Sequence, residues 1–153
     1  MILLIGETKP GPGFAWLRLC QFQRALPEAV VVDIHDKNCE KLAGQSDCIV
    51  SAGIYGPTYT ALSVCGDKPL WLDLPGDPFA DAQGYGPEAA TEAAAVFVPA
   101  LQRADAFSTI SERARYALLG QLGLCGRLAG LPPGRDPVFV LPAEIPIPPI
   151  RHP

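Results

Sequence analysis

Six short apolar runs recur along the chain, separated by polar or amphipathic stretches. Most are rich in Val, Ile and Leu and are bounded by Gly, Pro or Asp, a pattern typical of strands that are buried on both faces. We therefore predict six strands, at Ile2–Ile5, Ala29–Ile34, Asp47–Ala52, Pro69–Leu72, Ala106–Ile110 and Val138–Leu141.

The stretches between these runs carry helical spacing. From Phe14 to Leu26, apolar residues recur every three or four positions, and Arg18, Gln21 and Arg24 share the opposite, polar face. Further helices are predicted at Asp36–Ala43, at Pro57–Cys65, at Pro87–Val98 and after the capping residue Ser111. Pro99 should kink or restart its helix, and Leu74–Gly86, rich in Pro, Gly and Asp, should be an irregular loop.

Strands that alternate with helices predict an α/β fold, with a doubly wound, mainly parallel six-stranded Rossmann-like sheet. In the common strand order 3-2-1-4-5-6, the ligand crevice lies outside the carboxyl ends of strands 1 and 4. That order would bring the loops Gly6–Gly13 and Leu74–Gly86 together at the crevice. The 153 residues suit one domain, at 1–141, followed by a proline-rich linker or tail at 142–153.

Composition excludes several classes of protein. A hydrophobic content of 48% with only 18% charged residues is not that of a disordered chain. A net charge of −4 disfavours a nucleic-acid partner. Five cysteines without a CxxC pair, and only two histidines, argue against a disulfide framework and a metal site. No apolar run reaches the length of a membrane helix, and we expect a cytoplasmic protein.

The loop Gly6–Gly13 is neither a phosphate-binding P-loop nor a dinucleotide fingerprint, because Pro12 and Trp16 stand where those motifs need other residues. It still starts a helix, whose amide groups can face an anion or a hydroxyl-rich ligand, or it is only a tight turn. His35 follows the second strand and is a base, a ligand contact or, as the preferred interpretation, an ordinary loop histidine.

The segment Lys68–Asp81 has three aspartates near the predicted crevice. A carboxylate there can take a proton from an attacking hydroxyl, so Asp73 and Asp77 are candidate catalytic bases. The alternative is that these aspartates cap turns, which is the preferred interpretation for Asp81.

Two segments resemble bacterial glycosyltransferases of the GT-B fold, of the glycosyl transferase group 1 type. Asp67–Pro78 is similar to the stretch after their fourth strand. Leu101–Arg113, with Gln121-Leu122-Gly123 further on, is similar to their pattern of a helix, Ala-Asp, a strand ending in Ser and a second helix.

The resemblance implies that residues 1–141 form the amino-terminal, acceptor-side domain of such an enzyme. A carboxyl-terminal domain, absent here, would bind most of the nucleotide-sugar donor, which is a co-substrate; no cofactor is expected. The resemblance matches Gly11 and Gly13 to the cleft-facing glycine loop and places Asp73 or Asp77 at the cleft. We add Phe14, His35 and Gly76 as candidate substrate-binding residues.

The leading hypothesis is thus half of a transferase that moves a sugar to an acceptor hydroxyl. The isolated chain should then be inactive, bind nucleotide sugars only weakly, and expose a surface that permits weak self-association. One rival is a non-enzymatic Rossmann-like binding or interaction domain. Another is a small self-contained nucleotide-dependent enzyme.

Overall fold

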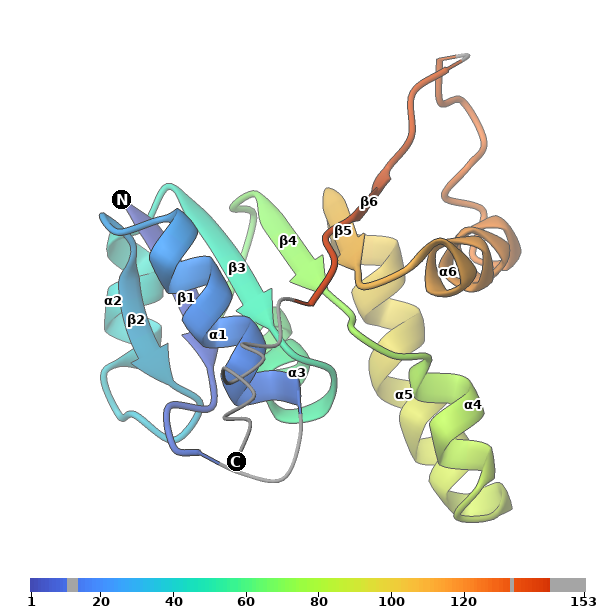
Figure 1. Cartoon of the computed structure of the whole chain (residues 1–153), viewed down its shortest axis with the longest axis horizontal. Coiled ribbons are helices and arrows are strands. Elements are labelled where there is room, and N and C mark those ends of the chain that lie inside the picture. Colours follow the sequence, from blue (N-terminus) through green and yellow to red (C-terminus); the bar gives the residue numbers. More distant parts are fainter. Residues whose placement is uncertain (11–13, 133, 144–153) are drawn as a thin grey trace, which may run out of the picture.

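The computed structural model describes residues 1–10, 14–132 and 134–143. Its elements alternate strictly between strand and helix up to the fourth strand, which is followed by two consecutive helices (Figure 1). The strands are β1 (Ile2–Gly6), β2 (Val30–Asp33), β3 (Cys48–Ala52), β4 (Leu70–Asp73), β5 (Ala106–Thr109) and β6 (Val138–Val140). The helices are α1 (Phe14–Ala25), α2 (Cys39–Gln45), α3 (Tyr55–Val64), α4 (Pro78–Gln83), α5 (Pro87–Arg103) and α6 (Glu112–Leu124).

The six strands form one sheet in which every neighbouring pair is parallel, as predicted. The strand order, however, is β2-β1-β3-β4-β5-β6 and not the expected 3-2-1-4-5-6. The connection through α2 passes over β1 and places β3 beside it, with Leu4 opposite Val50. The direction in which successive strands are added to the sheet therefore reverses between β1 and β3, which makes this the switch point. The predicted pairing of the loops after β1 and β4 at the switch point is wrong.

The two faces of the sheet are covered unequally. Strand residues of one face pack with α2, α3, α5 and α6 in the larger apolar core, in which Phe97, Leu101 and Leu122 are fully buried. On the opposite face, Leu4, Val50 and Ala52 pack against Leu19 and Phe22 of α1. Figure 1 shows α1 over β1 and β3, and among the described residues it is the only helix on that face.

The loop predicted at Leu74–Gly86 contains the short helix α4. Asp77 begins it as an N-cap that accepts hydrogen bonds from the amides of Phe79 and Ala80, and Pro78 occupies the first turn, where its missing N–H costs nothing. Asp-Pro is a turn signal in isolation, but here it begins a helix. The helices α4 and α5 then run beside one another beyond the carboxyl ends of the strands (Figure 1).

Helix α5 does not end at Val98 and restart at Pro99, which was one of the two predicted outcomes; it continues through Pro99 to Arg103. Proline removes one backbone hydrogen bond, here to the carbonyl of Ala95 one turn earlier. Both Pro99 and Ala95 are exposed. The freed carbonyl group can therefore be hydrated, and the buried side of the helix, at Phe97 and Leu101, holds the helix together.

Candidate functional site

The two candidate catalytic aspartates both lie at the carboxyl end of β4, but in different environments. Asp73 is the last residue of the strand and is 0% exposed, whereas Asp77 lies four residues later and is half-buried. The alternation of side chains along β4 explains the first placement. Leu70 and Leu72 enter the larger core, and Trp71 and Asp73 point to the side of α1.

Asp73 is held by a buried ion pair. Arg18 of α1, only 2% exposed, donates from Nε to Asp73 Oδ2 at 2.7 Å and from Nη2 to Oδ1 at 2.6 Å. Ser108 of β5 donates a third hydrogen bond to Oδ1 at 2.6 Å and accepts one from Trp71 Nε1. Both oxygens of Asp73 therefore have partners and neither reaches solvent, so the geometry gives this carboxylate a structural role and disfavours it as a base.

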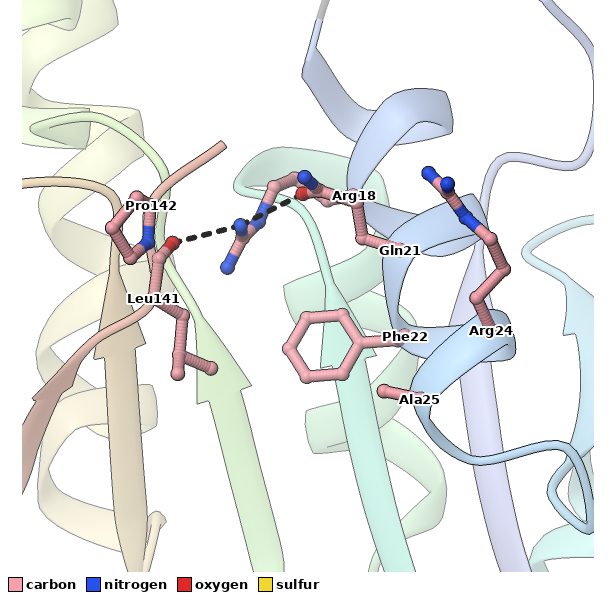
Figure 2. Close-up of a pocket in the computed structure, with 7 residues that line it drawn as sticks. All are labelled: Arg18, Gln21, Phe22, Arg24, Ala25, Leu141 and Pro142. Carbon is pink, nitrogen blue, oxygen red and sulfur yellow. Dashed lines mark hydrogen bonds between the residues drawn. The ribbon is translucent and has the colours of Figure 1, made fainter. Parts of the chain in front are cut away.

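The same guanidinium joins α1 to the segment after β6. Arg18 Nη1 donates to the carbonyl oxygen of Leu141 and to Gln21 Oε1, both at 2.9 Å (Figure 2). A groove of about 470 Å³ lies between this segment and α1. Its lining is formed by Arg18, Gln21, Phe22, Arg24, Ala25, Leu141 and Pro142.

The chemistry of this groove is mainly apolar. Phe22 packs edge-on against Trp71 at a centroid distance of 5.3 Å, and the charge of Arg18 is neutralised by Asp73. In Figure 2 the side chain of Arg24 points away from Leu141, so it contributes to the rim. The groove can accept an apolar surface, but it offers no free charge at its centre.

Asp77 keeps one carboxylate oxygen available. All three of its hydrogen-bond donors, the amides of Phe79 and Ala80 and the Nε2 group of Gln121, bind Oδ1 at 2.9–3.1 Å. No donor to Oδ2 occurs within the described part of the chain. Three donors on one oxygen fix the orientation of the carboxylate, and two of them are the amides that Asp77 caps at the start of α4.

The second strand ends in a separate network. Asp33 Oδ2 accepts hydrogen bonds from the hydroxyl and the amide of Thr8, at 2.6 Å and 3.0 Å, and Oδ1 accepts one from the amide of His35. The side-chain hydrogen bond of Thr8, followed by the two backbone hydrogen bonds, lowers the pKa of Asp33 to about 2. Asp33 thus ties the loop after β1 to the loop after β2.

The switch point itself, between β1 and β3, is closely packed. Gly53 has φ of +134°, which favours glycine, and a Cβ atom there would lie 3.1 Å from Ala15 Cβ and 3.0 Å from Pro57 Cγ. The starts of α1 and α3 therefore meet over this glycine, which leaves little space for a ligand at that point.

The predicted site residues do not form one cluster in the described structure. The exposed His35 follows β2, at the end of the sheet, three strand spacings or about 14 Å from β4. Gly76 lies in the loop before Asp77, where a Cβ atom would be 3.1 Å from Ile54 Cδ1, so it is a packing position. Gly11 and Gly13 lie outside the described residues. Phe14 begins α1, and its side chain also lies outside the description.

The sequence analysis did not predict two residues that contact the candidate aspartates, Arg18 of α1 and Gln121 of α6. Arg18 was expected on the solvent face of its helix because its charge fits the polar stripe, yet it is buried against Asp73. A signal for this pair is the Asp at the end of an otherwise apolar strand, which needs a cation if it is buried. Gln121, which holds Asp77 from α6, had no local signal because the two residues are 44 positions apart.

Other classes of site have little support in the described residues. They contain no group of three or more His, Cys, Asp or Glu side chains that could hold a metal ion. All five cysteines are unpaired thiols. No described helix combines the length and the hydrophobicity needed to cross a bilayer.

Comparisons of the chain with family models, with curated proteins and with solved structures found no match.

Proposed function

We propose that this domain is the acceptor-binding half of a sugar transferase, with Asp77 as the general base. The observation that carries the proposal is the Asp77 carboxylate, which stands at the carboxyl edge of a parallel sheet with Oδ1 fixed by three donors and Oδ2 available. The α/β fold and the resemblance of Asp67–Pro78 to glycosyltransferases support the same interpretation.

In this mechanism, Asp77 Oδ2 takes the proton of an acceptor hydroxyl as the acceptor oxygen bonds to the anomeric carbon of the donor sugar. The bond from that carbon to the diphosphate breaks, and the nucleoside diphosphate leaves with the electron pair. A second domain would bind the donor, because a diphosphate needs several converging donors or cations. The role of this chain is to position the acceptor and to remove its proton.

A titration of the isotope-labelled chain by NMR tests the proposal. Hydroxyl-bearing acceptors such as simple glycosides should shift the amide signals of Phe79 and Ala80, which bind Asp77, and leave the amino-terminal ends of the strands unchanged. Nucleotide sugars should bind only at about millimolar concentration or more weakly. Micromolar binding of a nucleotide sugar, or turnover by the chain alone, would instead support a small self-contained enzyme.

A second candidate function is a non-enzymatic interaction domain. It is favoured by the face of β5 and β6 on the side of α1, which no described helix covers and where Phe139 is 53% exposed. In that case glycosides should leave the Asp77 loop unchanged, and a bound partner protein should shift the signals of Phe139 and Leu141.

A further inference from the structure

A second cavity lies between the start of α3 and the pair of helices α4 and α5, on the same side of the sheet as Asp77. Its volume is about 480 Å³, within the range of small-molecule pockets. Tyr55, Tyr85 and Glu92 line it together with Phe97, Val96 and three alanines. The lining is thus mostly apolar and carries a few polar groups, which is the usual composition of a ligand site.

The two tyrosines are more exposed than the fold requires. Tyr85 is 85% exposed and Tyr55 is 49% exposed, while Phe97 between the helices is fully buried. Phe97 contacts Tyr55 edge-on at a centroid distance of 5.7 Å and so holds that ring at the cavity. An exposed aromatic ring adds little to the stability of the fold. A tyrosine side chain has few torsions, so it loses little conformational entropy when a flat ligand packs on its ring.

The electrostatic character of the cavity is negative. Glu92 lines it, and Asp81 and Asp77 lie close enough to Tyr55 to act on its hydroxyl group. Burial, and then the charge of Asp81, raises the pKa of Tyr55, with smaller contributions from Tyr85 and Asp77. None of the described residues that line the cavity is Lys, Arg or His. A phosphorylated ligand would therefore be repelled, and a neutral ligand with hydroxyl groups would find carboxylate acceptors.

We propose that this cavity binds the acceptor as a neutral sugar ring, with one face of the ring against Tyr85 and Tyr55 and a hydroxyl group donating to Glu92. The proposal rests on the proposed function, since it names the substrate class of the same carboxyl edge. The C–H groups on one face of a pyranose suit the negative face of an aromatic ring, and its hydroxyl groups suit Glu92.

The position of Asp77 connects this cavity to the proposed chemistry. Tyr55, a wall of the cavity, donates from its hydroxyl to the carbonyl oxygen of Pro78, the residue next to Asp77, at 3.5 Å. Asp77 does not line the cavity itself, but its charge acts on Tyr55, so the Tyr55 end of the cavity lies toward the loop that carries the proposed base. A ligand in the groove of Figure 2 would instead lie on the opposite face of the sheet, against α1.

The experiment is an NMR titration with methyl glucoside and, as a matched anion, methyl glucoside 6-phosphate. The neutral glycoside should shift amide signals around Tyr85 and Glu92 at millimolar concentration, and the phosphate should bind roughly tenfold more weakly. Tyr85→Ala should weaken glycoside binding at least about tenfold, and Tyr85→Phe should retain most of it. Glu92→Gln should reduce the discrimination against the phosphate.

Matched control variants separate the cavity from general effects. Tyr59 and Tyr116 are 62% and 67% exposed but do not line the cavity, so Tyr59→Ala and Tyr116→Ala should leave binding unchanged. Glu88→Gln, on an exposed position of the same helix as Glu92, controls for charge alone. Equal losses of binding in the tyrosine controls, or no shifts at the cavity, would overturn the proposal. Preferred binding of tetramethylammonium would overturn it too, because the tyrosines would then form a site for a cation and not for a neutral sugar.

The two proposals fail separately. Glycoside shifts at Phe79 and Ala80 that do not respond to Tyr85→Ala would leave the acceptor role standing and remove the cavity as its site. Glycoside binding could instead depend on Tyr85 in a protein that transfers no sugar even with a donor domain present. That result would support the cavity as a sugar site and contradict the proposed transferase function.

Discussion

At the scale of single residues, carboxylates that are close in the sequence are bound in different ways. Asp73 and Asp77 are four residues apart, yet one is neutralised by Arg18 and the other presents a free oxygen. The difference arises because Asp73 ends β4 and points to the side of α1, where Arg18 lies. Asp77 follows the strand and contacts the start of α4 and Gln121 of α6.

Breaking the buried pair on one side should be costly. Arg18→Met leaves Asp73 as an uncompensated charge without solvent, so we expect the free energy of unfolding to fall by about 3–5 kcal/mol. The double variant Arg18→Met with Asp73→Leu removes both charges and should recover a large part of the loss. Urea denaturation of the three proteins measures this; a double variant as unstable as Arg18→Met would contradict it.

Asp33 should make stability depend on acidity. Its pKa of about 2 lies below the ordinary value of 3.8, so its contribution is present above pH 4 and is lost as the pH falls from 4 toward 2. Thr8→Val removes the largest cause and should raise the pKa of Asp33 toward 3.8. An NMR titration of the carboxyl group measures both values, and an unchanged pKa in the variant would exclude Thr8 as the cause.

The free oxygen of Asp77 predicts a kinetic effect. In the proposed transferase, assayed together with a donor domain, Asp77→Asn should lower turnover by roughly 10²–10⁴-fold, because the amide cannot take a proton. An amide oxygen can still cap α4, so the fold should be kept. Asp81→Asn, which alters the exposed carboxylate in the same helix, is the control and should have a much smaller effect on turnover.

At the scale of elements, α4 depends on its N-cap residue, Asp77. Asp77→Ala removes the side-chain acceptor for the amides of Phe79 and Ala80. We expect a loss of about 1 kcal/mol in the free energy of unfolding and faster amide exchange within Pro78–Gln83. Asp77→Asn should largely avoid both effects. Identical exchange in the alanine variant and the parent would show that α4 is held by its packing on α5 alone.

The sequence predicted the elements well where the apolar pattern was local. All six strands, and the parallel sheet with helices on both faces, follow from short apolar runs and the helical spacing between them. The pattern could not choose the strand order, because crossing over β1 through α2 leaves no signature in either strand. Helix α4 was missed because its six residues are too few for a period and carry the composition of a loop.

The candidate site was less predictable than the fold. Asp77 was predicted as a candidate from its position after an apolar strand, and no finding tests that role. The contacts that distinguish it from Asp73 could not be predicted, because Gln121 and Arg18 reach these aspartates from helices distant in the sequence. The tyrosine cavity was not found at all. Tyr55 and Tyr85 come from segments 30 residues apart, and the packing of α3 and α4 on α5 brings them together.

At the scale of the whole molecule, the unequal cover of the sheet should influence association. Phe139 lies on β6, an edge strand, and is 53% exposed on the face without a described helix beyond α1. We expect weak self-association at high concentration, and Phe139→Lys should shift the equilibrium to monomer. Sedimentation equilibrium measures this. Tyr116→Lys, which charges another exposed aromatic position, serves as the control and should not have the same effect.

The bonds of Arg18 also set an order of events during synthesis. Arg18 leaves the ribosome 55 residues before Asp73 and 123 residues before Leu141, its two tertiary partners. Until β4 has joined the sheet, the guanidinium has no counter-charge and the inner side of α1 cannot dock without burying a lone cation. The first half of the nascent chain should therefore remain loosely packed. The side of the sheet that α1 covers becomes complete only when nearly the whole domain has emerged.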